Sequence, residues 1–228
     1  MSLLTNKFNY YSLTRDESTG KRLYLCPDST KVPSVTTILD ATKSQEKIDI
    51  LNAWKARKGE KQAKEIVTEA ASRGTRMHKY LEDYIKGVPL KESVSNPYAQ
   101  QSLDMAKVVI KEGFTDITEI WGSEVQLYYP GLYAGTTDLV GTHKNDESIM
   151  DFKQTNRPKK EEWIEDYYLQ LCAYALAHNK LFNTNIQKGV VLMCSANYEY
   201  QEFILTPNQF SYWEDKWWDR VEQYYSQQ

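Results

Sequence analysis

Two aspartates and a lysine, close together in the chain, are the residues of this sequence best suited to chemistry. Asp138 comes first, and Asp151, Phe152 and Lys153 follow after a polar turn. One predicted strand carries Asp138 near its end, and the next predicted strand ends with Asp151, Phe152 and Lys153. Side chains alternate along a strand, so Asp151 and Lys153 share a face while Phe152 points into the core. If the two strands pair, Asp138 lies beside Asp151. Two carboxylates and an ammonium suit a hard divalent cation and a water to be activated, so we interpret the set as a metal-dependent phosphodiesterase centre.

The first half of the chain predicts a small hairpin followed by helices. Residues 10–12 and 22–25 are candidate strands around a turn at residues 18–20. Hydroxyl side chains after Pro33 predict a helix start, and residues 46–58 predict a second helix with Ile48, Leu51 and Trp54 on one side. A longer helix is expected over residues 61–86, interrupted near residues 73–74, with a buried stripe of Met77, Leu81 and Ile85. Residues 98–112 predict another helix.

The second half predicts a sheet with helices on it. Residues 117–129 form a strand that carries Glu124, and the two central strands follow. A helix over residues 161–179 places Gln170 and Tyr174 on one face, four positions apart. Residues 189–195 are continuously apolar, which is typical of a strand buried on both faces, and residues 198–205 alternate as an outer strand does. A final helix starts at Thr206-Pro207. This order predicts an α/β fold with a mixed central sheet and the metal site on its central strands.

The composition fits one large domain, or one domain with an appended subdomain. The chain has 228 residues, 41% of them hydrophobic, and a net charge of -3, which argues against a generally basic nucleic-acid binder. The charge is uneven, because residues 41–80 contain ten Lys or Arg and five Asp or Glu. A locally basic arm beside an acidic site could grip a polyanion, and a solvated helical face explains the same charges equally well.

Three scattered cysteines, Cys26, Cys172 and Cys194, form no zinc-binding or disulfide pattern. The sequence contains no secretory signal, no membrane span and no segment typical of a mitochondrial transit peptide. We therefore expect a cytoplasmic protein that does not bind membranes. The compact length suggests a bacteriophage source, which would make the location the host cytoplasm.

The order of these residues resembles the PD-(D/E)xK nuclease superfamily, in its RecB-like exonuclease branch. Within that branch the chain is similar to the mitochondrial genome maintenance exonucleases and their bacteriophage relatives. The resemblance covers residues 33–205 and also includes Pro33-Ser34-Val35-Thr36 and Arg73-Gly74-Thr75. The elements that carry it are His78, Glu124, Asp138, Asp151-Phe152-Lys153, Gln170 and Tyr174. In two respects the chain departs from its relatives: Thr137 precedes Asp138 where a proline is common, and four cysteines for an iron–sulfur cluster are missing.

The resemblance implies a restriction-endonuclease-like core with a helical N-terminal arm. Residues 1–115 would form the hairpin and the arm that contributes His78, and residues 116–228 the nuclease core and C-terminal helix, as one integrated domain. It also implies one or two Mg²⁺ or Mn²⁺ ions and no iron–sulfur cluster. The implied metal ligands are His78, Glu124, Asp138, Asp151 and the backbone carbonyl of Phe152. The implied catalytic residues are Asp138, Asp151, Lys153 and Gln170, whereas Glu82 is expected to steady its helix or a basic neighbour.

The expected activity is hydrolysis of DNA phosphodiester bonds, exonucleolytic and on single-stranded ends, in replication, recombination or repair. The helical arm would thread or clamp the strand. A non-catalytic DNA-end-binding or recombination protein and an endonuclease of the same fold are the alternatives. Protein partners are not indicated. Trp54 could stack on bases, although core packing is the favoured interpretation for it. Expected DNA contacts are Ser34, Thr36, Lys55, Arg57, Arg73, Arg76, Tyr133, Thr155, Arg157 and Tyr174.

Overall fold

A mixed five-stranded sheet forms the centre of the molecule, which the computed structural model describes over residues 4–16 and 23–227. The strand order is β4-β5-β6-β7-β8, in which β6 and β7 run parallel and the other neighbours antiparallel. The strands are β4 Ile117–Tyr129, β5 Tyr133–His143, β6 Asp146–Thr155, β7 Lys188–Ser195 and β8 Tyr200–Leu205. The α/β class with a mixed central sheet, expected from the sequence, is confirmed.

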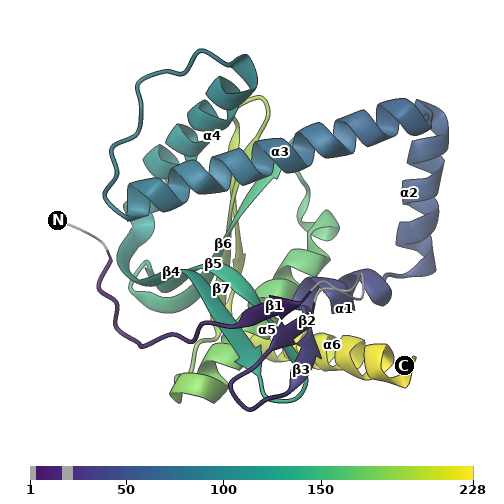
Figure 1. Cartoon of the computed structure of the whole chain (residues 1–228), viewed down its shortest axis with the longest axis vertical. Helices are drawn as coiled ribbons and strands as arrows, with labels where there is room; N and C mark the ends of the chain where they lie inside the picture. Colours follow the sequence, from purple (N-terminus) through teal and green to yellow (C-terminus); the bar gives the residue numbers. More distant parts are fainter. Residues whose placement is uncertain (1–3, 17–22, 228) are drawn as a thin grey trace.

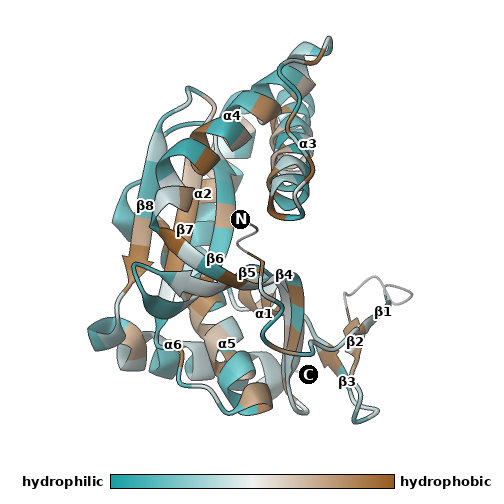
Figure 2. Cartoon of the chain, turned by 90° about the vertical axis from the view of Figure 1, so that its left-hand side faces the viewer, coloured by the Kyte–Doolittle hydropathy of each residue, from teal (hydrophilic) through white to brown (hydrophobic). Residues whose placement is uncertain are grey.

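Helices cover both faces of this sheet (Figure 2). The helices α3 (Glu60–Ile85) and α4 (Pro97–Gly113) lie on one face, and α5 (Glu165–Phe182) and α6 (Pro207–Ser226) lie on the other. Successive residues of β6 show the alternation, because Met150 joins the core under α3 and α4 while Ile149 joins the core over α5 and α6. All of β7 is buried, as its continuous apolar run predicts.

The N-terminal region forms a second, three-stranded sheet. Its strands are β1 Thr14–Asp16, β2 Leu23–Leu25 and β3 Lys31–Pro33. The prediction of a strand at residues 10–12 is wrong, because Tyr10 packs its ring against His178 and Phe182 of α5. The predicted turn at residues 18–20, and Arg22 of the other predicted strand, lie outside the described residues.

A helical arm connects this small sheet to the core (Figure 1). After the short helix α1 (Val35–Ala41), α2 (Gln45–Lys58) leads to one end of α3, which crosses the molecule. Gly59 forms the corner between α2 and α3 with φ of 79°, a left-handed conformation that glycine adopts at little cost. The predicted start of α1 is confirmed, since Ser34 caps it and accepts the Thr37 N–H at 3.0 Å. The helical N-terminal arm is therefore confirmed.

Two details of the arm differ from the prediction. The helix α3 is continuous through residues 73–74, where an interruption was expected, and its stripe of Met77, Leu81 and Ile85 is buried as predicted. The predicted apolar side of α2 is not buried, because this helix stands away from the core and buries no residue. The predicted division of the chain after residue 115 remains a prediction. No helix among the described residues is long and apolar enough to span a membrane.

A histidine on α5 is buried among aromatic rings. The ring of His178 is fully buried against Phe8 and Phe182, and its nitrogens pair with the Tyr10 hydroxyl at 3.2 Å and the Thr184 hydroxyl at 2.8 Å. Burial, with a smaller contribution from the charge of Lys7, lowers the pKa of His178 from 6.5 to about 4. In the unfolded chain the same ring takes up a proton near its ordinary pKa.

We predict that His178 destabilises the fold as pH falls from 6.5 to 4. Over this range the unfolded state binds the proton and the folded state does not, which removes on the order of 3 kcal/mol of unfolding free energy below both pKa values. His178→Gln keeps a hydrogen-bonding side chain that does not titrate there. Denaturant unfolding at pH 7, 5.5 and 4 should show a shallower pH dependence in this variant, and an unchanged slope would contradict the assignment.

Candidate active site

The two aspartates lie where the pairing of β5 with β6 ends. The paired residues run from His143 and Asp146 to Leu139 and Met150, so Asp138 and Asp151 come next on their strands. The Phe152 N–H donates to Asp138 Oδ2 at 2.6 Å and ties one aspartate to the strand that carries the other. Both aspartates are buried, with 8% of Asp138 and 3% of Asp151 exposed. The two carboxylates therefore lie next to each other in the structure, as predicted from the sequence.

Lys153 pairs with Asp151 on the same face of β6. Its Nζ forms an ion pair with Asp151 Oδ2 and lies 5.2 Å from the centre of the Tyr167 ring on α5. The side chain of Phe152 points to the opposite face, as predicted, and stacks on Phe114.

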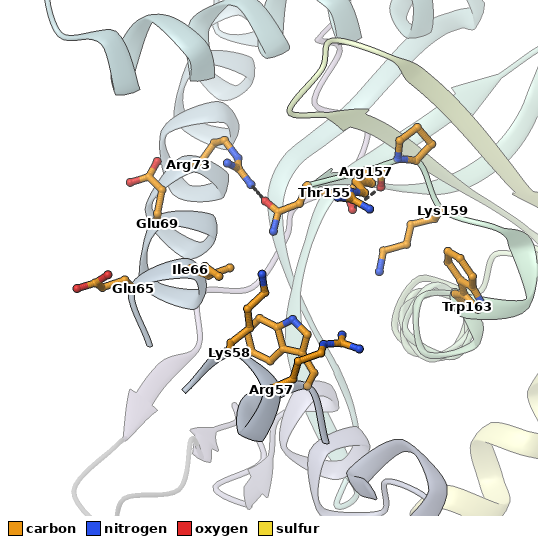
Figure 3. Close-up of a pocket in the computed structure, with 13 residues that line it drawn as sticks. Arg57, Lys58, Glu65, Ile66, Glu69, Arg73, Thr155, Arg157, Lys159 and Trp163 are labelled. Atoms are coloured by element: carbon orange, nitrogen blue, oxygen red, sulfur yellow. Dashed lines mark hydrogen bonds between the residues drawn. The ribbon is translucent and has the colours of Figure 1, made fainter. Parts of the chain in front are cut away.

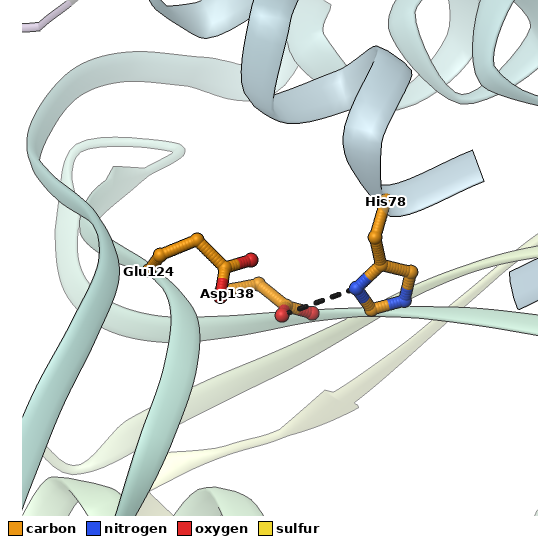
Figure 4. Close-up of side chains that lie close together, drawn as sticks. All are labelled: His78, Glu124 and Asp138. Atoms are coloured by element: carbon orange, nitrogen blue, oxygen red, sulfur yellow. Dashed lines mark ion pairs between the residues drawn. The ribbon is translucent and has the colours of Figure 1, made fainter. Parts of the chain in front are cut away.

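A histidine and a glutamate from neighbouring elements complete the cluster around Asp138 (Figure 4). His78 on α3 places Nδ1 at 3.3 Å from Asp138 Oδ1, and Glu124 on β4 faces the same carboxylate. One potential ligand atom from each of these three residues lies within 4.8 Å of the others. They line a cavity of about 490 Å³ together with residues of α3. Asp151 lies outside this group of three, beside it on β6.

The backbone of Glu124 is unusual for a strand residue. Its φ is 53°, in the left-handed region, between the regular pairs that Ser123 forms with Leu139 and Val125 with Thr137. A non-glycine residue in this region is disfavoured by about 1 kcal/mol or more, because Cβ crowds the following carbonyl. The distortion occurs opposite Asp138, where it affects how the glutamate enters the cluster.

Burial and mutual repulsion shift the pKa values of this cluster. Burial, and then the Asp138 charge, raise the pKa of Glu124 to about 7. Burial raises the pKa of Asp151 to about 6, because it outweighs the opposing Lys153 charge, and Asp138 adds to the rise. Burial disfavours the charged form of His78, but the neighbouring Asp138 and Asp151 raise its pKa to about 9. For Asp138 burial is outweighed by His78, so its pKa is lowered.

The donor set fits a divalent cation. Carboxylate oxygens suit Mg²⁺ and Mn²⁺, and an imidazole nitrogen is acceptable to Mn²⁺. The raised pKa values of Glu124 and Asp151 show that burial disfavours their charged forms, and a positive ion would relieve this. A second group of Asp116, His143 and Glu202 has similar spacing. There Lys144 Nζ lies 3.1 Å from both carboxylates, so an ammonium already balances their charge.

A pocket of about 810 Å³ lies between the arm and the loop after β6 (Figure 3). Helices α2 and α3 form one side, and the segment from Thr155 to the short helix η2 (Glu161–Trp163) forms the other. Two acidic side chains, Glu65 and Glu69, also reach it. The basic and aromatic residues that line it are Trp54, Arg57, Lys58, Arg73, Arg157, Lys159 and Trp163. The pocket is therefore positive and carries exposed ring surface.

Four of the predicted DNA contacts line this pocket: Arg57, Arg73, Thr155 and Arg157. The Arg57 and Arg157 side chains are exposed and free to meet a phosphate. Thr155 is buried and donates its hydroxyl to the Arg157 carbonyl at 2.8 Å. Arg73 is only 6% exposed, and its guanidinium binds Gln154 and Asn156, so its main contacts are within the protein.

The other basic and hydroxyl candidates lie elsewhere or are occupied. Ser34 is buried as the cap of α1, and its hydroxyl contacts that of Thr36 at 2.9 Å. Lys55 lies against a different part of α3, beside Lys64 and Val67. Arg76 donates to the Ser102 hydroxyl and pairs with Glu69. The prediction that Ser34 binds a phosphate is wrong in this conformation, because its buried side chain already caps α1.

Two aromatic assignments are also corrected. Tyr133 cannot stack on a base, because it is fully buried with its ring against Trp217 and its hydroxyl on the Ala173 carbonyl. Core packing was favoured for Trp54, but α2 buries no residue and Trp54 lines the basic pocket. Tyr174 is buried and receives the Gln170 amide at 3.4 Å, so contact with DNA would need it to move. Gln170 is half-buried.

Several residues of the site were missed from the sequence. Tyr167 lies three positions before Gln170, so helical spacing could have placed it on the same face of α5. Lys159 follows Arg157-Pro158 directly, and the run of basic residues was a usable signal. Nothing in the sequence pattern marks Trp163 or Gln154, because their roles depend on how α2 and α3 pass over β6.

Comparison with known proteins confirms the resemblance that the motifs predict. No protein-family model matches the sequence. The chain is 26% identical over 205 residues to mitochondrial genome maintenance exonuclease 1 of Xenopus tropicalis, and 25% identical over 206 residues to the human protein of that name. The alignments cover 85% of this chain but only 57% and 58% of these curated relatives. A solved structure from Eubacterium rectale superposes at a TM-score of 0.47 and 12% identity, over 68% of this chain and 64% of that one.

We predict that Glu124→Gly and Glu124→Ala distinguish the effect of the Glu124 carboxylate on metal binding from the effect of its left-handed backbone on stability. Both variants lose the third member of the His78–Asp138 cluster and should bind Mn²⁺ more weakly in calorimetric titration. Glycine accepts the φ of 53° and alanine does not, so the glycine variant should be more stable than the alanine variant by about 1 kcal/mol in denaturant unfolding. Equal stabilities would show that the left-handed backbone costs nothing here, and unchanged Mn²⁺ affinity would exclude Glu124 from the ligand set.

Proposed function

We propose that this chain is a divalent-metal-dependent DNA exonuclease that hydrolyses phosphodiester bonds at single-stranded ends. The observation that carries the proposal is the convergence of His78, Glu124 and Asp138 beside the Asp151–Lys153 pair, at the point where β5 and β6 separate. The names of the curated relatives support the exonuclease activity. Replication, recombination or repair is the setting that such an activity suits.

The residues of the centre would divide the work of hydrolysis. His78, Glu124, Asp138 and Asp151, with the Phe152 carbonyl, would hold one or two Mg²⁺ or Mn²⁺ ions. A bound ion would polarise the phosphate and lower the pKa of a bound water. Lys153 is charged, since the neighbouring aspartates raise its pKa against burial, and it would orient the attacking water and offset charge on the phosphate. Tyr167 restrains the Lys153 ammonium from the side of α5.

The basic pocket would hold the strand that leads to the centre. The helix α3 lines both sites: Glu65 to Arg73 face the basic pocket, and Gly74 to Glu82 face the metal-ligand cavity. A strand that follows α3 would therefore pass from one to the other. The exposed ring of Trp163 and the half-buried ring of Trp54 line this pocket and offer faces on which unpaired bases can stack, which supports a single-stranded substrate. The arm of α2 and α3 would thread or clamp that strand and so favour free ends.

We expect Asp151→Asn and Lys153→Ala to reduce the rate of DNA hydrolysis by at least about 100-fold, because each removes charge that acts on the reacting phosphate. Lys111→Ala removes a lysine whose side chain is 82% exposed and serves as the control. The assay follows end-labelled single strands with Mg²⁺ or Mn²⁺. A wild-type protein that binds ends without cutting them would indicate the non-catalytic alternative. Equal cleavage of circular and linear single strands would indicate an endonuclease.

We expect Trp163→Ala to weaken binding of single-stranded oligonucleotides by about 1–3 kcal/mol, the usual loss for one stacked base. Trp163→Phe should retain most of the affinity. Tyr212→Ala removes a comparably exposed ring on α6, away from the pocket, and should leave affinity unchanged. Fluorescence anisotropy of a labelled oligonucleotide with the Asp151→Asn protein measures binding without cleavage. Equal affinities for all four proteins would remove Trp163 from the strand's path.

A further inference from the structure

One side chain joins the long helix of the arm to the strand of the proposed catalytic lysine. Gln154 on β6 donates its amide to the Ala70 carbonyl of α3 at 2.9 Å. Its amide oxygen accepts the Nε–H of Arg73 at 2.8 Å. Arg73 is only 6% exposed and also donates to Asn156, two residues further along the chain (dashed in Figure 3). Both polar ends of the Gln154 amide are therefore used to hold α3.

The same contact explains a glycine inside the helix. A Cβ on Gly74 would lie 3.3 Å from Gln154 Cγ, tighter than an ordinary van der Waals contact. Glycine in a helix interior costs about 1 kcal/mol relative to alanine, so its presence there needs a packing reason. The aliphatic part of the Gln154 side chain fills the space beside Gly74. The helix α3 continues through residues 73–74, and the hydrogen bonds of Gln154 to Ala70 and Arg73 support it there.

This junction lies one turn from the proposed metal ligand. Gly74 and His78 are four positions apart on α3 and share a helix face. Gln154 follows Lys153 on β6, and side chains alternate, so Gln154 points toward α3 while Lys153 points toward Asp151. The bonds that hold the Gly74 turn of α3 against β6 thus also position the next turn of this helix. From that turn His78 places Nδ1 at 3.3 Å from Asp138 Oδ1, and its ring centre lies 6.0 Å from that of Phe152.

We propose that Gln154 is a positioning residue: its bonds to Ala70 and Arg73, with its stem against Gly74, set the height of α3 above β6 and so place His78 against Asp138. The proposal rests on the proposed function only for the catalytic purpose of placing His78 against Asp138. The geometry itself can be tested in the metal-free protein.

The test uses Gln154→Ala and Gly74→Ala, which disturb the junction from its two sides. Gln154→Glu keeps the acceptor for Arg73 and the stem against Gly74, but it replaces the donor to Ala70 with a charged acceptor oxygen. Gln101→Ala is the matched control. Gln101 lies on α4 rather than α3, is also half-buried, and donates to a distant carbonyl, that of Ala196. Thermal unfolding of all four variants establishes that they are folded.

The first readout is the nuclear Overhauser effect between the rings of His78 and Phe152 without metal. The chain has three histidines, so their ring signals are easily separated, and His178 is an internal reference. We expect the His78–Phe152 effect to be weakened at least about 3-fold in Gln154→Ala and in Gly74→Ala, weakened as well in Gln154→Glu, and retained in Gln101→Ala. Wild-type intensity in both alanine variants of the junction would overturn the proposal.

The second readout is the split between kcat and KM for single-stranded DNA. Misplacing His78 should lower kcat about 10-fold in Gln154→Ala while KM changes less than about 3-fold, and Gln101→Ala should leave both values unchanged. A proportionate loss in the Gln101→Ala control would show general loosening and count against the proposal. If the wild-type protein is inactive, the proposed function fails, and the ring-contact measurement still decides the positioning role.

Discussion

Asp138 and Asp151 are buried next to each other, and the repulsion between their charges is the constraint to which the rest of the site responds. Two carboxylates in a low-dielectric environment cannot both ionise without partners. His78 reaches in from α3 to Asp138, and Lys153 turns back onto Asp151 from two residues along the strand. The pKa values separate accordingly, lowered for Asp138 and raised for Asp151. Glu124 adds a third carboxylate, and burial, followed by the charge of Asp138, raises its pKa against the opposing effect of His78.

That constraint makes the position of α3 decisive. This helix brings the one imidazole of the cluster, and it also forms one wall of the basic pocket. Its buried stripe packs on the sheet, but an apolar stripe alone tolerates small shifts along and across the surface. The polar junction at Gln154 and Arg73 has directional bonds and therefore defines a register that apolar packing leaves loose. A basic path and an acidic centre are in this way attached to one rigid element.

The elements of the core were predictable from the sequence because their signals are local. Alternation around Asp151, the continuous apolar run of β7 and the cap at Ser34 all depend on neighbours in the chain. What could not be predicted depends on contacts between distant segments. The exposure of α2 follows from its standing away from the core, and so Trp54 lines a pocket although its spacing suggested burial. Tyr133 failed in the opposite sense, because α6 covers it with Trp217. The resemblance to known nucleases singled out Asp138, Asp151 and His78, which lie together in the structure, but it could not single out Gln154, which lies outside the motif and contacts α3 instead.

The two histidine–carboxylate groups of this chain differ in the cations that the protein places beside them. His143, Asp116 and Glu202 are as closely spaced as His78, Asp138 and Glu124. In the first group the Lys144 ammonium lies between the two carboxylates, and hydrogen bonds from His143 and then Lys144 outweigh burial and lower the pKa of Glu202 to about 2. In the second group Lys153 is paired with Asp151, and Lys79, which lines the same cavity, is paired with Glu82 and Asp83. The pKa of Glu124 rises. Both groups meet the same distance limit, and they differ in the cation that pairs with them: the Lys144 ammonium in the first and the His78 imidazole, on Asp138 alone, in the second. Lys153 pairs with Asp151, and no ion pair of Glu124 occurs among the described residues, which is why we propose the His78–Asp138–Glu124 group as the cation site.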